Sequence, residues 1–168
     1  SIGYNAYTLL TAGKDEYGES YPIFFRSFGD YRPPIAVYST VPFIWLLGLS
    51  EVAVRLHSVF YGLITIIMLY FLGKELWSTG LGLWAAFTGA TMPWLIHYNR
   101  SGFEFSAYAA LFVSSVYLMV KASQNRRYIL PAFAVSALTL YTYQPARLLV
   151  PLLAAGVIVW KRDAKTLA

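Results

Sequence analysis

Cysteine is absent from this chain of 168 residues, and charged residues make up only 12% of it. The first absence excludes a disulfide framework, a thiolate metal site and a cysteine nucleophile. No P-loop, dinucleotide-binding or zinc-protease motif occurs, so nothing indicates soluble nucleotide chemistry. The two histidines lie too far apart for a metal motif, and His57 is expected to be packed or hydrogen-bonded.

The chain is rich in apolar residues and poor in charged ones. The chain is 58% hydrophobic and 18% aromatic, and its mean hydropathy is +0.53. A soluble domain usually carries about a quarter charged residues, so the bilayer is the expected solvent. The 14 Tyr and 5 Trp suit a protein whose amphipathic rings gather at the two membrane interfaces.

Charge-free runs predict an all-α polytopic membrane protein, because a membrane-spanning helix needs about 20 mostly apolar residues. The runs are 33–50, 56–73, 76–99, 105–120, 128–146 and 148–160. We expect an extracytoplasmic loop over 1–32, an interfacial helix over 33–50 and about five spans within 51–168. Trp45 and the Pro33-Pro34 corner favour the interfacial position of 33–50, but charge leaves a membrane crossing there open.

Basic residues are distributed unequally between the two sets of loops. One set balances six basic against six acidic residues, whereas the other carries an excess of five positive charges. Cytoplasmic loops attract Lys and Arg, so the second set is expected to be cytoplasmic. Its charged members are Lys74, Lys121, Arg126, Arg127, Lys161, Arg162 and Lys165, with Glu75 and Asp163.

Arginine dominates the basic residues of the outer set. A guanidinium presents a planar fork that binds phosphate through two hydrogen bonds, so these arginines predict a phosphate-binding surface. The alternative is that each one snorkels from a helix end or forms an ordinary ion pair. The candidates are Arg32, Arg55, Arg100 and Arg147.

Four acidic residues, Asp15, Glu16, Asp30 and Glu104, are expected on the same membrane face. A carboxylate there can act as a general base or provide oxygen ligands for a divalent cation. Asp30 is the candidate metal ligand. Glu104 lies between two predicted spans, where an unpaired charge is costly, and a structural pair with Arg100 at helical spacing is the competing interpretation.

Several sequence segments also resemble a known group of enzymes. The segments are 28–34, 45–58, 62–76, 93–106 and 141–147, and together they extend over nearly the whole chain. They resemble the protein mannosyltransferase and aminoarabinose transferase group, glycosyltransferase family 39. These are membrane enzymes of the GT-C type, so the resemblance implies a GT-C-like helix bundle with an extracytoplasmic first loop.

The resemblance implies transfer of a sugar from a polyprenyl-phosphate donor to a hydroxyl of a lipid, glycan or protein, with inversion. Arg32 matches the family's basic residue near the lipid phosphate, and Glu104 matches the acid of the second outer loop. The family's catalytic Asp-Glu pair would lie just before Ser1, so we expect an N-terminal fragment that is inactive alone. Asp15 and Glu16 are secondary candidates for the catalytic base.

A non-enzymatic polyprenyl-lipid transporter or membrane scaffold is the alternative function. Transporters place ionisable groups near the bilayer midplane, whereas this chain keeps nearly all charges at the ends of the apolar runs. The charge pattern therefore favours the enzyme. Its expected location is a bacterial or archaeal cytoplasmic membrane, with membrane lipids as neighbours, no nucleic acid partner, and a divalent cation as a candidate cofactor.

Sidedness can be tested in the cysteine-free background. Cysteines introduced at Ser123 and Thr166 should resist an impermeant thiol reagent in intact cells, because their loops carry the basic excess. A cysteine at Ser101 should react. Rapid labelling at the first two positions with protection at the third would contradict the predicted orientation.

Overall fold

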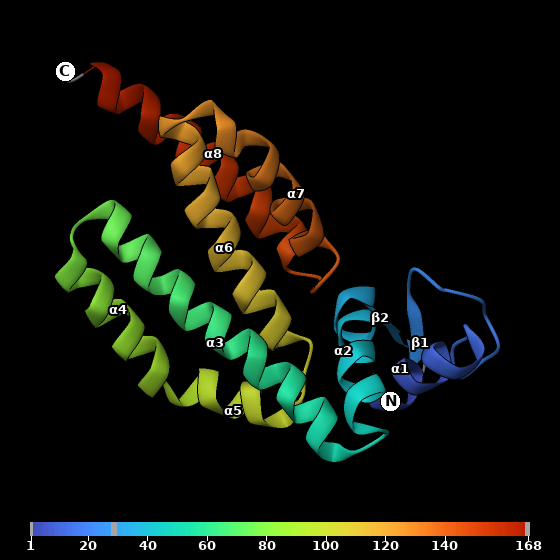
Figure 1. Ribbon diagram of the computed structural model, residues 1–168. Helices are drawn as coiled ribbons and strands as arrows, with labels where there is room; N and C mark the ends of the chain where they lie inside the picture. The colour runs from blue at the N-terminus through green and yellow to red at the C-terminus, as the bar shows by residue number, and fades with distance from the viewer. Residues whose placement is uncertain (1, 28–29, 167–168) are drawn as a thin grey trace.

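The computed structural model of the chain describes residues 2–27 and 30–166, and the side chains of 27, 30 and 158–166 are outside that description. The described part contains eight α-helices, one 3₁₀ turn and one small sheet (Figure 1). The helices are α1 Ile2–Ala12, α2 Pro34–Leu47, α3 Glu51–Leu76, α4 Thr79–Thr91, α5 Pro93–Ser101, α6 Phe105–Gln124, α7 Ile129–Leu140 and α8 Ala146–Thr166. The 3₁₀ turn is Arg126–Tyr128, and the strands are β1 Phe25–Ser27 and β2 Asp30–Arg32.

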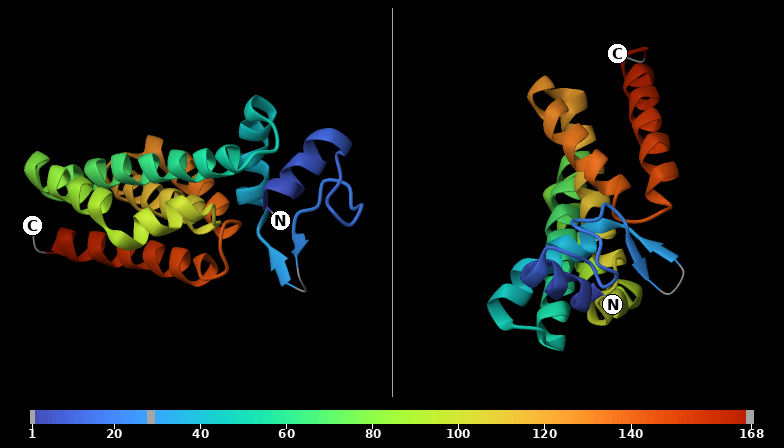
Figure 2. Two further views of the ribbon diagram at one scale, coloured as in Figure 1. Left: turned by 90° about the horizontal axis from the view of Figure 1, so that it is seen from below. Right: turned by 90° about the vertical axis from the view of Figure 1, so that its right-hand side faces the viewer.

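Helices α3 to α8 run back and forth in an elongated bundle, and α1, α2 and the β-hairpin lie at one end of it (Figures 1 and 2). We call this the hairpin end; there the ring of Phe24 lies 6.5 Å from that of Tyr141 in the α7–α8 loop. At the opposite end, Lys121 on α6 pairs with Glu75 on α3 at 2.6 Å. We call that the basic end. The two sets of loops that the sequence separates therefore lie at opposite ends of the bundle.

Two of the described helices, α3 and α6, are long and apolar enough to cross a membrane. Their 26 and 20 residues correspond to about 39 and 30 Å, against a hydrocarbon core of about 30 Å. The run 76–99 is not one continuous helix, because the chain is extended at Met92 and restarts at Pro93. Proline lacks the N–H that would continue the hydrogen-bond ladder. The remaining spans stay predictions.

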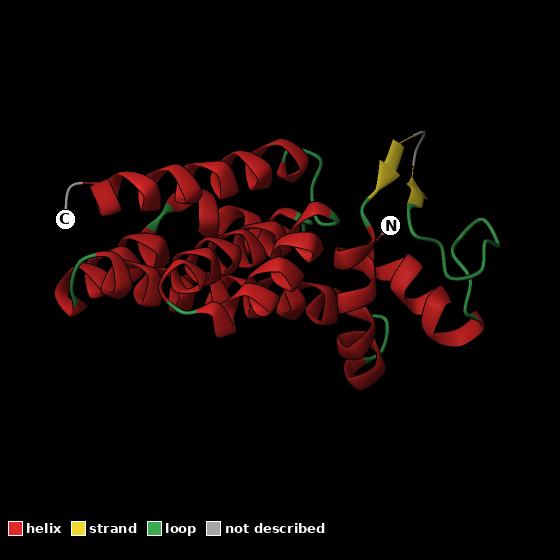
Figure 3. Ribbon diagram, turned by 90° about the horizontal axis from the view of Figure 1, so that it is seen from above, coloured by secondary structure: helices red, strands yellow, loops and turns green. Residues whose placement is uncertain are grey.

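The first 32 residues are more structured than a loop. They contain α1 and an antiparallel hairpin in which Phe25 pairs with Arg32 and Arg26 with Tyr31 (Figure 3). The all-α expectation is therefore confirmed for the bundle, to which this short sheet is added. Three-residue strands are too short to produce a recognisable alternating pattern in the sequence.

A buried cluster attaches the N-terminal segment to the bundle. Its members come from α1, β1, α2 and the first turn of α3: Ile2, Ala6, Leu9, Phe25, Ala36, Val37, Ile44 and Ala53. The Tyr38 hydroxyl adds a hydrogen bond to the Pro22 carbonyl at 3.1 Å. Partial burial, and then the nearby Tyr21 hydroxyl, raise the pKa of Tyr38, so this donor keeps its proton at neutral pH.

His57 joins α2 to α3, which confirms the expectation that it is packed and hydrogen-bonded. It is 1% exposed, and its Nε2 lies 2.8 Å from the Ser39 hydroxyl on α2. The rings of Phe43 and Tyr61 pack on the imidazole, with centroids 5.8 and 5.0 Å away. A polar contact inside an apolar interface fixes the relative position of the two helices.

Glycines bring α3 and α4 into close contact. A Cβ built on Gly82 would lie 2.6 Å from the Tyr70 carbonyl and 3.0 Å from the Lys74 nitrogen, both of which are backbone atoms. A Cβ on Gly73 would lie 2.9 Å from the Gly82 Cα. Small residues at such crossings let helix backbones approach closely, which favours packing inside a membrane.

Gly82→Ala should therefore destabilise the protein by about 1–3 kcal/mol, because the added methyl meets backbone atoms that cannot rotate away. Thermal unfolding in detergent measures the effect. Gly80→Ala is the matched control, since its Cβ would meet only the Ser78 Oγ at 3.9 Å. It should leave stability unchanged or raise it by up to about 1 kcal/mol. Equal stability of the two variants would contradict the close packing.

Candidate functional site

A hollow of about 530 Å³ opens at the hairpin end of the molecule. It is formed by the start of α1, the end of β2, the start of α3 and the α5–α6 turn. Its lining residues are Ile2, Gly3, Tyr4, Arg32, Leu49, Ser50, Glu51, Val54, Ser101, Gly102 and Phe103. Helices and strands begin or end here, and the polar and charged residues of this mainly apolar protein lie at such ends. The hollow therefore has polar and charged groups in its lining. We call it the Arg32 hollow.

Arg32 reaches the hollow from a fixed corner of the chain. It is the last residue of β2, and its strand partner Phe25 is completely buried. Pro33 and Pro34 follow, with Pro33 extended at φ −60° and Pro34 opening α2. Proline restricts both its own backbone and that of the preceding residue, so the direction in which Arg32 leaves the hairpin is largely determined.

A second wall of the hollow is the N-terminus of α3. The Ser50 hydroxyl caps this helix by accepting a hydrogen bond from the Ala53 N–H at 3.2 Å. Glu51 follows and pairs with Arg55, with Oε1 and Nη2 2.6 Å apart. Both side chains are more than half exposed, so this pair adds little stability. The sequence marks Glu51 only as a helix start and gives no sign that it lines the same hollow as Arg32.

The third wall is the turn between α5 and α6. Gly102 has φ +72°, and a Cβ there would lie 3.1 Å from Val54 Cγ1, so the turn sits directly on α3. Phe103 is 48% and Tyr4 51% exposed, and both rings stand at the hollow. Sequence reasoning did not single out either aromatic residue, because they are 99 positions apart and only the fold brings them together.

Glu104 follows Phe103 and is half-buried immediately before α6. Helix α5 ends at Ser101, so Arg100 and Glu104 do not lie on one continuous helix, as a pair at helical spacing would require. Glu104 follows Phe103 of the Arg32 hollow in the sequence, but it is not among the residues that line the hollow.

Of the four candidate arginines, only Arg32 is among the described residues that line this hollow; Arg55 touches it only through its ion pair with Glu51. Arg100 is exposed and borders a smaller, mainly apolar hollow of about 220 Å³ between α3, α4 and α5. The Arg147 guanidinium lies 5.7 Å from the centre of the Phe24 ring, a cation–π contact. The structure therefore brings Arg32 together with Glu51 and its partner Arg55, and places Arg100 and Arg147 at separate positions.

Asp15 shapes the loop after α1. It is 5% exposed, and its Oδ1 accepts hydrogen bonds from the Tyr17 N–H at 2.9 Å and the Glu19 N–H at 2.8 Å. The Glu16 N–H donates to the buried Asn5 amide at 3.0 Å, which attaches the loop to α1. Neither Asp15 nor Glu16 lines the Arg32 hollow.

The candidate metal ligand, Asp30, pairs with Ser27 through its backbone, but its side chain is outside the described residues. Elsewhere in the described part of the chain, no three His, Asp or Glu side chains are grouped closely enough to hold a metal ion. A cation site at Asp30 stays a prediction from the sequence.

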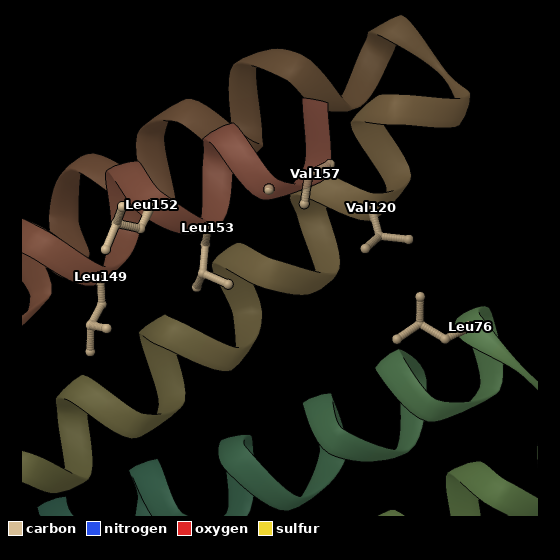
Figure 4. A pocket seen from close by; sticks show the side chains of 7 residues that line it. Leu76, Val120, Leu149, Leu152, Leu153 and Val157 are labelled. Atoms are coloured by element: carbon tan, nitrogen blue, oxygen red, sulfur yellow. The ribbon is translucent and has the colours of Figure 1, made fainter. Parts of the chain in front are cut away.

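The hollows toward the basic end are apolar. In one of about 380 Å³, Leu149, Leu152 and Leu153 of α8 face Leu76 of α3 across α6 (Figure 4). No charged side chain lines it. Group-transfer chemistry needs groups that move protons or stabilise charge, so the Arg32 hollow is the better candidate for a reaction site.

The family profile for dolichyl-phosphate-mannose-protein mannosyltransferases matches residues 31–168, which include Arg32 and Glu104. The chain belongs to this family. Membership implies a membrane glycosyltransferase that uses a polyprenyl-phosphate-linked sugar, which confirms the resemblance that the sequence motifs carry. No curated protein and no solved structure matches the chain significantly.

The role of Asp15 in this mannosyltransferase-family protein can be measured as stability. Asp15→Ala should lower the free energy of unfolding by about 1–3 kcal/mol, because two backbone N–H groups lose their acceptor. Asp15→Asn should lose less, since its amide oxygen can replace Oδ1. Glu19→Ala removes an exposed carboxylate from the same loop and is the control. If thermal unfolding shows that Asp15→Ala loses no more stability than Glu19→Ala, this structural role of Asp15 is contradicted.

Proposed function

We propose that this family member transfers a sugar from a polyprenyl phosphate to a hydroxyl of a lipid, glycan or protein at the Arg32 hollow. The observation that carries the proposal is the position of Arg32, a guanidinium fixed at a proline corner and half-buried in the hollow. Family membership supports a donor of this chemical class.

Arg32 would bind the donor phosphate. A guanidinium can donate two parallel hydrogen bonds to phosphate oxygens, and the positive charge stabilises the phosphate as it leaves. Glu51 faces the same space and could accept hydrogen bonds from sugar hydroxyls, while the exposed ring of Phe103 provides an apolar surface. Such a mixture of aromatic and convergent polar groups is typical of small-molecule sites.

The reaction itself would be a single displacement. The acceptor oxygen forms a bond to the anomeric carbon, the bond from that carbon to the phosphate oxygen breaks, and polyprenyl phosphate leaves with the bonding electrons. Attack from the face opposite the phosphate inverts the anomeric centre. A carboxylate takes the acceptor proton, and Glu104, which directly follows Phe103 of the hollow in the sequence, is the candidate base.

The hairpin end would face outward. The loops at this end have balanced charge, whereas the opposite end carries the basic excess that cytoplasmic loops attract. On this orientation α2 lies at the outer interface and holds the Pro33-Pro34 corner there. A donor phosphate in the outer headgroup layer would then reach Arg32 while its prenyl chain stays in the bilayer.

In the intact protein, Arg32→Ala should weaken donor binding about 10- to 100-fold, because charge-assisted hydrogen bonds contribute about 1.5–3 kcal/mol each. Arg32→Lys should recover part of this loss, since lysine keeps the charge but not the two-pronged geometry. Donor affinity can be measured by calorimetry with a short-chain polyprenyl-phosphate sugar.

Arg26→Ala is the matched control, because Arg26 lies on the other strand of the hairpin, is exposed and stacks 5.5 Å from the Tyr17 ring. It should bind the donor as the wild type does. A folded Arg32→Ala protein with unchanged affinity would remove Arg32 from the site, and full recovery by lysine would identify it as a simple interfacial anchor.

A further inference from the structure

An apolar groove of about 630 Å³ runs between α6, α7 and α8, and Val157 of α8 lines both this groove and the hollow of about 380 Å³. Ile129, Ala132, Ala137 and Leu140 of α7 form one wall, and Val150 and Val157 of α8 form the other. Its lining includes no charged side chain. The groove is therefore suited to a hydrocarbon chain.

The groove extends along the whole of α7, because Ile129 and Leu140 are the first and last residues of that helix. Twelve helical residues measure about 18 Å. A single acyl chain that enters from the basic end would therefore lie along the groove and point toward the hairpin end, where the α7–α8 loop contacts Phe24.

The charge at the mouth of the groove is positive. Arg126 and Arg127 directly precede Ile129, both are exposed, and neither forms an ion pair within the described part of the chain. The Asn125 side chain accepts a hydrogen bond from the Arg127 N–H at 3.1 Å and so fixes the turn. Basic residues beside a groove between membrane helices are typical of anionic headgroup sites.

We propose that this groove binds an anionic phospholipid, with its phosphate at Arg126 and Arg127 and one acyl chain along α7. The charge distribution separates this site from the sugar donor, because Arg32 lies at the opposite end of the bundle. Bound lipid would fill the gap between α7 and α8 and hold them against α6. The inference does not depend on the proposed transfer reaction, and its test requires no sugar.

The test uses the intact protein in nanodiscs of phosphatidylcholine with increasing phosphatidylglycerol. Native mass spectrometry counts retained lipids, and a thermal melt records stability. The wild type should bind phosphatidylglycerol more tightly than phosphatidylcholine. In the double variant Arg126→Gln/Arg127→Gln, the ratio of these two affinities should fall by at least about tenfold. Lys74→Gln, which removes an exposed charge at the same end but outside the groove, should keep it.

A second pair of variants tests the groove itself. Ala137→Phe fills the groove and should abolish the extra stability that phosphatidylglycerol gives, whereas Leu130→Phe, on the exposed surface of α7, should not. Equal affinity of the wild type for both lipids would overturn the proposal. So would an Ala137→Phe variant that loses the same stability in both lipids, since the stabilisation by phosphatidylglycerol would then not depend on an open groove.

Discussion

Helix α3 is the element on which the other contacts depend. It packs against α1, α2, α4, α5 and α6, and its closest approach is to α4, where Gly73 and Gly82 leave no room for side chains. Within a membrane there is little hydrophobic force between helices, so close van der Waals packing of this kind has to supply much of the association. The positions of α1, α2, α4, α5 and α6 are then set relative to α3, whereas α7 and α8 are placed through their contacts with α6.

The polar hollow results from the way in which elements end near α3. The proline corner terminates the hairpin, Ser50 caps α3, and Gly102 closes α5 with a left-handed residue. Helix ends leave backbone donors and acceptors without helical partners, so water and polar side chains gather at such places. The same turns that satisfy local backbone geometry therefore produce a site on a protein with little charge.

Much of the helical layout could be predicted from apolar runs, as α2, α3 and α6 demonstrate. Pro93 interrupts the run 76–99, but a proline inside an apolar run does not by itself determine whether the helix kinks or ends there. Residue type and the proline corner make Arg32 a candidate in the sequence, and its role stays a prediction. Its neighbours Glu51 and Tyr4 could not be identified, because their meeting depends on how α1 and α3 dock, which no local pattern encodes.

The spacing of the contacts has a consequence for biogenesis. Gly73 and Gly82 are only nine positions apart, so α3 and α4 can pair as a helical hairpin soon after both leave the ribosome. Phe24 and Tyr141, by contrast, belong to segments separated by most of the chain. The hairpin end is therefore expected to be completed late, after the helices that support it have formed, so a mutation there would act on this last step of folding and not on the pairing of α3 with α4.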